Sequence, residues 1–433
     1  MMKSIAVGLL GLGTVGSGVV TILKNHQDKL MHQVGCPIEV KKVLVQDVHK
    51  HRTVEIDPSF LTTNANEVIE DPEIDVVIEV MGGIEDTRQL VLQALRNKKH
   101  VVTANKDLMA LYGPELLKVA SENGCDLFYE ASVAGGIPIL RGLVDGFASD
   151  RIIKMMGIVN GTTNFILTKM SKFGSAYEEV LKEAQELGYA EADPTSDVEG
   201  LDAARKMAIL ASLGYSMNIE LKDVRVQGIS SVTSDDIEYS KRLGYVVKLI
   251  GTAHRKGEKV EVSVQPTLLP ESHPLAGVND EYNAVYVYGE AVGETMFYGP
   301  GAGSLPTATS IVSDLVAVMK NMRLGVNGLS SVSPQYEKKL KDDSEIFSKY
   351  FLRIHVKDQV GAFAKITSLF SERGVSFEKI LQLPLKNKNV AEIVLVTHEA
   401  SLRDYEEILV QLRDLQIIQE VKSSYRVEGG NQG

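Results

Sequence analysis

A glycine-rich segment near the N-terminus, residues 11–16 (GLGTVG), most constrains how this chain folds. It follows an apolar run, residues 4–10, that is typical of a buried β-strand, and precedes an amphipathic stretch, residues 14–33, that is typical of a helix. A strand, a tight glycine turn and a helix in this order form the phosphate-binding end of a Rossmann-type domain. The alternative is an ordinary strand-to-helix turn without a ligand. The sequence favours a dinucleotide site at the positive end of the helix, formed by Gly11, Gly13, Thr14, Val15 and Gly16.

The end of the second expected strand carries signals for both nicotinamide dinucleotides. Asp47 can accept a hydrogen bond from the ribose 2′-hydroxyl of NAD, whereas Lys50 and Arg52 can pair with the 2′-phosphate of NADP. The two nearby cations favour NADP, and NAD stays possible.

The rest of the chain indicates an α/β protein of three domains. Short Val/Ile runs separated by helical stretches predict a parallel sheet covered on both faces. Its strands are expected at 4–10, 40–45, 75–80, 100–103 and 126–129, and its helices at 14–33, 87–97 and 114–123. We expect a dinucleotide-binding domain at 1–130, completed by a helix at 310–328, an α+β catalytic and dimerisation domain at 131–309, a linker at 329–349 and a regulatory domain at 350–428.

The second and third domains differ from the first in pattern. After Gly136, strands are expected at 152–160, 260–266 and 284–289, helices at 177–187, 200–213 and 310–321, and a polar loop at 160–164. Residues 351–427 show strand, helix, two strands, helix and strand, which predicts a ferredoxin-like βαββαβ unit.

Composition excludes several classes of function. The chain has 433 residues and a net charge of -11, with no basic cluster, so we expect neither a nucleic-acid nor a membrane partner. No apolar run is long enough to cross a bilayer or to act as a secretory signal. The two cysteines, Cys36 and Cys125, are far apart and indicate a reducing, cytoplasmic location.

Two lysines stand out by their positions. Lys106 follows the expected strand at 100–103, at the sheet edge where open α/β folds bind ligands. Lys206 lies four residues after Asp202 on an expected helix, so the two side chains share a face. They could orient a polar substrate and move a proton. The residues alone favour the alternative, an exposed ion pair worth a few tenths of a kcal/mol.

Two polar segments leave similar alternatives open. Glu191, Asp193 and Asp197 fall within nine residues, either as a solvated acidic loop or as a site for a cationic ammonium group. Residues 160–164 (NGTTN) form either a simple turn or a set of hydroxyl and amide donors that line a polar pocket.

Together these motifs resemble the homoserine dehydrogenase family over essentially the whole chain. The residues that carry the resemblance are the segments 11–16 (GLGTVG), 102–106 (VTANK), 157–164 (GIVNGTTN), 188–194 (GYAEADP), 200–206 (GLDAARK) and 299–303 (GPGAG). The resemblance implies reversible, NAD(P)H-dependent reduction of L-aspartate 4-semialdehyde to L-homoserine, in threonine, methionine and isoleucine biosynthesis.

The resemblance also implies roles for single residues. Lys206 would donate the proton and Lys106 would lie close to both cofactor and substrate. The substrate's amino group would be held by Glu191 and Asp202, and Asp197 would also bind the substrate. Cofactor contacts would come from Gly188 and Gly303, and a monovalent cation such as Na+ would be bound by Glu130, Val133, Gly135 and Ile137, mainly through carbonyl groups. These roles reverse the preference for a simple ion pair between Asp202 and Lys206.

Residues 351–427 resemble an ACT domain, although Val360 stands where many such domains have proline. This implies feedback control by threonine, or else a purely structural dimerisation module, in a homodimer or homotetramer. Two further hypotheses differ in class. An ACT-bearing 2-hydroxy-acid dehydrogenase would carry its glycine loop in mid-chain and a paired histidine, and a non-catalytic dinucleotide sensor would tolerate loss of both lysines.

Overall fold

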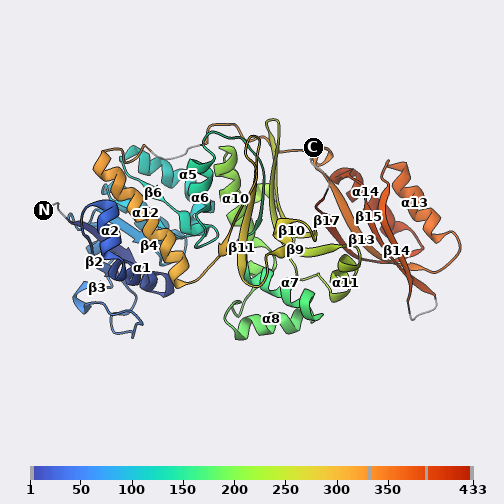
Figure 1. The fold of residues 1–433 in the computed structure, drawn as a ribbon, viewed down its shortest axis with the longest axis horizontal. Coiled ribbons are helices and arrows are strands. Elements are labelled where there is room, and N and C mark those ends of the chain that lie inside the picture. The colour runs from blue at the N-terminus through green and yellow to red at the C-terminus, as the bar shows by residue number, and fades with distance from the viewer. Residues whose placement is uncertain (1–3, 330–333, 386–388, 430–433) are drawn as a thin grey trace. The chain divides into compact units, whose positions relative to one another are not determined.

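The computed structural model describes residues 4–329, 334–385 and 389–429 (Figure 1). These residues divide into two compact units, each built from separate stretches of chain. The first unit comprises Met1–Ile153, Arg205–Asp223 and Asn283–Lys338, and the second comprises Lys154–Ala204, Val224–Tyr282 and Lys339–Gly433. The expected domain boundaries follow chain order instead, so they stay predictions. Residues 330–333 of the expected linker and the turn at 386–388 lie outside the described residues.

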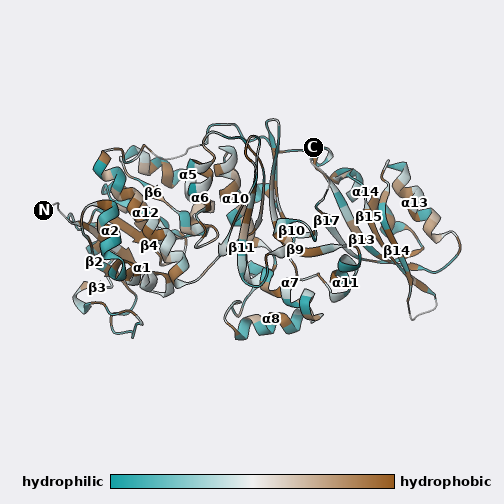
Figure 2. Cartoon of the chain, viewed as in Figure 1, coloured by the Kyte–Doolittle hydropathy of each residue, from teal (hydrophilic) through white to brown (hydrophobic). Residues whose placement is uncertain are grey.

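The first unit contains a six-stranded, fully parallel sheet in the order β3-β2-β1-β4-β5-β6. Its central strands β1, β4 and β5 are buried along their whole length, which explains their largely apolar sequences. In Figure 2, brown, apolar residues gather in the interior of this unit. The strands are β1 (Ile5–Leu10), β2 (Ile38–Leu44), β3 (Leu61–Thr62), β4 (Val76–Glu79), β5 (His100–Thr103) and β6 (Leu127–Phe128). The parallel sheet expected from the sequence is therefore confirmed.

Helices pack on this sheet, and α12 packs beside α1 and α2 to bury one apolar core (Figure 1). The helices are α1 (Thr14–Asn25), α2 (Gln27–Val34), α3 (Asn66–Ile69), α4 (Glu85–Arg96), α5 (Lys106–Glu122) and α12 (Ser304–Leu324). The unit also includes α6 (Ile139–Arg141), most of α10 (Leu201–Tyr215), and the strands β11 (Tyr282–Gly289) and β12 (Gly293–Pro300).

Two helix predictions in this unit were wrong. The stretch 14–33 is two helices, because the backbone at His26 leaves the helical region, with φ of -117° and ψ of 27°. Helix α5 begins at Lys106 and contains Pro114, which sequence analysis took as the start. It begins earlier because the Asn105 side chain accepts a hydrogen bond from the amide of Leu108, at 3.0 Å, and so caps the helix.

The second unit contains strands in the order β7-β9-β10-β17-β13-β15-β14. Its strands are β7 (Ile152–Ile158), β8 (Val224–Val226), β9 (Tyr245–Lys256), β10 (Lys259–Pro270), β13 (Phe347–Lys357), β14 (Phe377–Pro384), β15 (Val390–Thr397), β16 (Ala400–Ser401) and β17 (Ile418–Val427). Its helices are α7 (Gly161–Phe173), α8 (Tyr177–Glu186), α9 (Thr195–Val198), the start of α10, α11 (Ser234–Arg242), α13 (Ala362–Glu372) and α14 (Leu402–Asp414).

The expected polar loop at 160–164 is in fact the start of helix α7. Asn160 is the N-cap, and its side-chain oxygen accepts a hydrogen bond from the amide of Thr163 at 2.9 Å. Thr162, Thr163 and Asn164 are buried in the first turn. Polar residues at a helix start resemble a turn in sequence, which explains the error.

The C-terminal part of the second unit has the predicted βαββαβ order, from β13 through α13, β14, β15 and α14 to β17. Its core packs both helices on one face of the sheet. Strand β17 also pairs with β10 in parallel, with Thr267 opposite Arg426 and Leu268 opposite Val427. The module is thus joined to the rest of its unit through backbone hydrogen bonds of a shared sheet.

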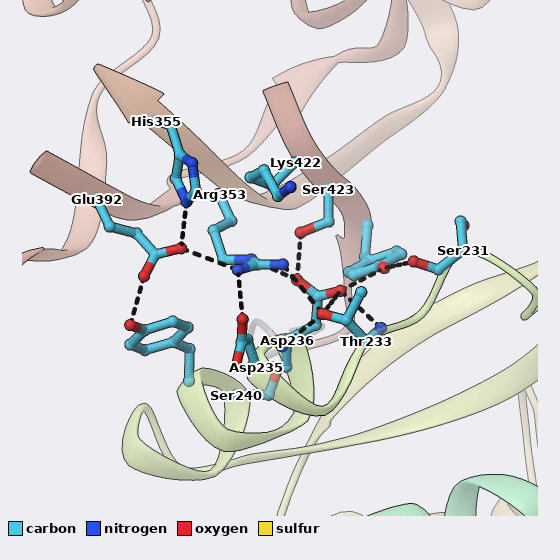
Figure 3. A network of polar contacts seen from close by, with 12 residues as sticks. Ser231, Thr233, Asp235, Asp236, Ser240, Arg353, His355, Glu392, Lys422 and Ser423 are labelled. Atoms are coloured by element: carbon cyan, nitrogen blue, oxygen red, sulfur yellow. Dashed lines mark hydrogen bonds and ion pairs between the residues drawn. The ribbon is translucent and has the colours of Figure 1, made fainter. Parts of the chain in front are cut away.

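A buried ionic network reinforces this junction between the module and helix α11 (Figure 3). The side chain of Arg353, on β13, is 1% exposed and donates to Asp236 Oδ1 at 2.7 Å and to Glu392 Oε1 at 2.9 Å. Asp236 is fully buried, and it also accepts hydrogen bonds from Ser423 and from Tyr425 at 3.0 Å. Because every charge has a partner of opposite sign, the network can remain ionised in the interior.

We expect Arg353→Met to lower the free energy of unfolding by about 3–5 kcal/mol, because it leaves two buried carboxylates without their cation. Urea denaturation followed by circular dichroism measures this. The matched control is Lys259→Met, which breaks the exposed pair with Glu345 and costs at most about 1 kcal/mol. Adding Asp236→Asn and Glu392→Gln to Arg353→Met should restore part of the loss. Equal stability of Arg353→Met and the parent chain would contradict the role of the network.

Candidate active site

The glycine loop at 11–16 leaves β1 and enters α1 with its backbone accessible. Gly11 has φ of +107°, and a Cβ there would lie 2.8 Å from the carbonyl oxygen of Val80. A Cβ on Gly16 would lie 2.4 Å from the carbonyl oxygen of Gly11, so the loop closes tightly on the helix. Gly13, in contrast, is exposed and has no atom within 4 Å of a Cβ position. The loop is therefore tightly packed at Gly11 and Gly16 and accessible from outside at Gly13.

The first turn of α1 is available to an anion. Its N-cap is Gly13, and no side chain caps the helix. The first helical hydrogen bond runs from the amide of Ser17 to the carbonyl of Gly13, at 2.9 Å. The amides of Thr14, Val15 and Gly16 precede it, at the positive end of the helix dipole. This arrangement suits a pyrophosphate.

The turn at 299–303 lies against this loop within the same unit. Gly303 has φ of +122° and is the N-cap of α12, and the Ser304 hydroxyl donates to the carbonyl oxygen of Thr14 at 2.7 Å. The structure therefore brings Gly303 close to the glycine loop.

The segment that follows β2 is also tied to the loop. The Gly11 amide donates to the carbonyl of Leu44 at 3.0 Å. Beyond it, the guanidinium of Arg52 donates to the carbonyl oxygens of Asp47, at 2.6 Å, and Lys50, at 2.7 Å. Asp47 and Lys50 are exposed and Arg52 is half-buried. All three residues that bear on cofactor choice thus belong to one folded segment.

Lys106 and Lys206 are each next in sequence to one residue of the ion pair between Asp107 and Arg205. Lys106 is the first residue of α5, and its side chain is 34% exposed. The next residue, Asp107, pairs with Arg205 on α10, with Nε 2.8 Å from Oδ1. Lys206 follows Arg205 directly and is half-buried. The Asp107–Arg205 pair therefore joins the start of α5 to the helix segment that carries Lys206.

In the second unit, Asn160 gathers two of the predicted carboxylates. Its Nδ2 donates to Asp197 Oδ1 at 2.7 Å and to Asp202 Oδ2 at 2.9 Å. Asp202 is only 5% exposed, so the idea of an exposed ion pair at this position was wrong. A buried carboxylate held by an amide is fixed in orientation.

Gly188 and Glu191 lie in an exposed loop that follows helix α8. Gly188 has φ of +79°. The loop is joined to α7, because the Thr162 hydroxyl donates to the carbonyl oxygen of Tyr189 at 2.6 Å. Helix α7 therefore contacts both the exposed loop and, through Asn160, the two aspartates.

Sequence analysis missed Lys248, a buried lysine on β9 beneath this region. It is 1% exposed, and its ammonium donates to the carbonyl oxygen of Val278 at 2.5 Å and to Asn164 Oδ1 at 3.0 Å. Burial lowers the pKa of Lys248 to about 8. A single lysine in an apolar strand carries no pattern that would reveal a partner on α7.

The segment proposed for a monovalent cation has unusual backbone geometry. Ala134 and Gly135 both have positive φ, +55° and +48°. The carbonyl of Gly135 accepts from the Ser310 hydroxyl at 2.7 Å, and that of Ile137 accepts from the amide of Ile139 at 2.8 Å. Each carbonyl retains a second lone pair. Main-chain oxygens in this setting fit a hard monovalent cation.

The side-chain carboxylate of Glu130 binds the backbone of the following segment. It accepts from the amides of Leu140, at 2.7 Å, and Arg141, at 2.8 Å. The Glu130 amide donates to Asp314, whose pKa is raised to about 7 by burial and by the charge of Glu130. The Glu130 side chain therefore anchors the segment.

None of the helices within 4–329, 334–385 and 389–429 is long and apolar enough to span a membrane. The same residues hold no group of three or more His, Cys, Asp and Glu side chains that could bind a metal ion.

Family models match most of the chain. Residues 138–316 match the model described as homoserine dehydrogenase, residues 11–130 match its NAD binding domain, and residues 350–416 match the ACT domain.

Known proteins resemble the chain over its full length. It is 71% identical to homoserine dehydrogenase of Bacillus subtilis over 99% of both chains, and 42% identical to that of Synechocystis over 98% of this chain and 99% of the relative. The crystal structure of the Thiobacillus denitrificans homoserine dehydrogenase superposes with a TM-score of 0.93, at 39% identity, over 98% of both chains. The chain therefore belongs to the homoserine dehydrogenase family of NAD(P)-dependent oxidoreductases that act on CH–OH groups.

Proposed function

We propose that Lys206 is the general acid of this enzyme. When L-aspartate 4-semialdehyde is reduced, negative charge develops on the aldehyde oxygen, and the Lys206 ammonium stabilises that charge and donates the proton. In the oxidation of L-homoserine, the neutral amine takes the hydroxyl proton back. The bound nicotinamide supplies or accepts the hydride. The observation that carries this proposal is the Asp107–Arg205 ion pair, because it joins the chain segments that hold both predicted lysines.

The substrate carries an ammonium and a carboxylate, so its site needs fixed charges of both signs. We assign the ammonium to Glu191 and Asp202, with Asp197 completing the acidic set through Asn160. Lys106 supplies positive charge near both substrate and cofactor, as its place at the sheet edge suggests.

For the cofactor, we propose NADP as the preferred dinucleotide, with NAD as the weaker substrate. The pyrophosphate of the cofactor would be bound by Gly11, Gly13, Thr14, Val15 and Gly16. Other parts of the dinucleotide would be contacted by Gly188 and Gly303. Lys50 and Arg52 would pair with the 2′-phosphate of NADP. The Arg52 guanidinium donates to the carbonyl oxygens of Asp47 and Lys50, which keeps the two cations in one segment.

Three further assignments remain proposals. Carbonyl groups of Glu130, Val133, Gly135 and Ile137 would hold Na+ or another monovalent cation, supported by the consecutive positive φ angles. The ACT module would bind L-threonine as a feedback effector of the threonine, methionine and isoleucine pathway. A homodimer or homotetramer stays a prediction. A cytoplasmic location also stays a prediction, and it is supported by the two cysteines, which are buried and form no disulfide.

We expect Lys206→Ala to lower kcat for homoserine oxidation far more than tenfold, because the alkoxide loses its only assigned proton partner. Steady-state kinetics with L-homoserine and saturating NADP measures this. If activity survived within about tenfold, or roughly 1.4 kcal/mol of barrier, Lys206 would not be the acid. The same assay with and without L-threonine tests the proposed effector.

We expect Asn160→Asp to raise KM for L-homoserine by about tenfold to a hundredfold, about 1.4–2.8 kcal/mol, with little change in KM for NADP. The new side chain still caps α7 but places a third carboxylate against Asp197 and Asp202, so that one of them binds a proton. Asn321→Asp is the matched control, since Asn321 donates to Asp126 at 2.8 Å in the other unit. Equal effects of the two variants on KM would exclude a specific role for Asn160.

We expect Arg52→Met to raise KM for NADP by about tenfold or more and to change KM for NAD much less, because only NADP carries the 2′-phosphate. The assay compares the two dinucleotides side by side. Lys118→Met removes an exposed charge on the same unit and should leave both KM values unchanged. A parallel rise for both dinucleotides would mean that Arg52 only shapes the loop.

A further inference from the structure

Glu79 is a fully buried carboxylic acid at the end of β4, in the middle of the parallel sheet. Its register partner on the neighbouring strand β5 is Thr103. A carboxylate seldom occurs in such a place, because removing it from water is costly unless donors replace the water. In the part of the chain that the structure describes, no basic side chain forms an ion pair with Glu79. Burial raises its pKa.

The donors that replace water come from two loops. Glu79 Oε1 accepts from the amides of Met81, at 2.9 Å, and Gly82, at 3.2 Å. Its Oε2 accepts from the Thr103 hydroxyl at 2.5 Å. The Thr103 oxygen in turn accepts from the amide of Asn105 at 3.0 Å. One side chain thus holds the backbone beyond β4 and, through Thr103, the backbone beyond β5.

The same two loops are cross-linked a second time. The Asn105 side chain donates to the carbonyl of Gly83 at 2.7 Å, while its oxygen caps α5 at Leu108. Gly82 and Gly83 have φ of +74° and +76°, so the loop beyond β4 is a tight left-handed turn. The bonds among Glu79, Thr103 and Asn105 therefore leave little freedom at either loop.

Each loop adjoins a part of the candidate active site. Val80 directly follows Glu79, and its carbonyl lies so close to Gly11 that a Cβ there would approach to 2.8 Å. Lys106 directly follows Asn105. Glu79 therefore stands between the dinucleotide loop and the start of α5.

We propose that Glu79 is a positioning residue for the dehydrogenase reaction: through Thr103 and the amides of Met81 and Gly82, it fixes Lys106 relative to the dinucleotide loop. The proposal rests on the role assigned to Lys106 above. It adds a residue that neither the glycine loop nor the lysine motif contains.

The test uses the full-length enzyme and the isosteric variant Glu79→Gln. The glutamine oxygen can still accept from Met81 and Gly82, but the amide cannot accept the Thr103 hydroxyl proton. We expect kcat for homoserine oxidation to fall tenfold or more, with KM for L-homoserine within threefold and the melting temperature within a few degrees. Thr103→Val should lower kcat to the same extent, whereas Thr103→Ser should not. The double variant Glu79→Gln/Thr103→Val should have a kcat little lower than that of either single variant.

Asp75→Asn is the matched control, because Asp75 directly precedes β4 at the end opposite Glu79. Asp75 accepts from the amide of Ala6 at 3.0 Å, so the change also converts a bonded carboxylate into an amide. It should leave kcat unchanged. The proposal is overturned if Glu79→Gln and Thr103→Val both keep kcat within twofold, or if Asp75→Asn lowers kcat as much as they do.

Lys106→Met separates this proposal from the proposed function. If Lys106→Met keeps full activity while Glu79→Gln and Thr103→Val lose it, the role of Lys106 fails, and Glu79 acts through the dinucleotide loop alone. The dissociation constant for NADPH, from its fluorescence, would then rise in Glu79→Gln. If Lys106→Met kept full activity and the dissociation constant of Glu79→Gln for NADPH were unchanged, the positioning role of Glu79 would also be overturned.

Discussion

Parallel pairing of β1, β4 and β5 is the constraint on which the first unit depends. In register, Leu10 lies opposite Glu79, and Glu79 lies opposite Thr103. Because parallel strands end at the same edge, the chain beyond each of these residues begins at the same level of the sheet. The glycine loop, the turn beyond β4 and the start of α5 are therefore neighbours before any side chain is considered. Glu79 adds hydrogen bonds between the ends of strands β4 and β5, which backbone pairing has already aligned.

In the second unit, the ACT module is attached by more than a covalent linker. The β10–β17 pair makes the module's sheet continuous with the strands before it, and Arg353 connects β13 to α11 through Asp236. Displacing the module from α11 would separate buried opposite charges, which costs several kcal/mol.

The sequence predicted those features that leave a local pattern. The glycine loop, the apolar parallel strands and the βαββαβ order each show in neighbouring residues, whereas strand β9 and helix α11 were missed. The start of α7 was wrong because a capped, buried first turn resembles a polar loop. Glu79 and Lys248 could not be found, because their partners Thr103 and Asn164 lie 24 and 84 residues away. A single charged residue in an apolar strand gives no sign of what compensates it.

Helix α10 carries charges of both signs that the proposed reaction needs. Asp202 lies in its first turn, buried and held by Asn160, and Lys206 follows four residues later. Along one helix this spacing corresponds to a rise of about 6 Å, comparable with the length of a four-carbon amino acid. In the proposed site, α10 therefore sets the spacing along its axis between Lys206 and Asp202, whereas Glu191 comes from the loop after α8.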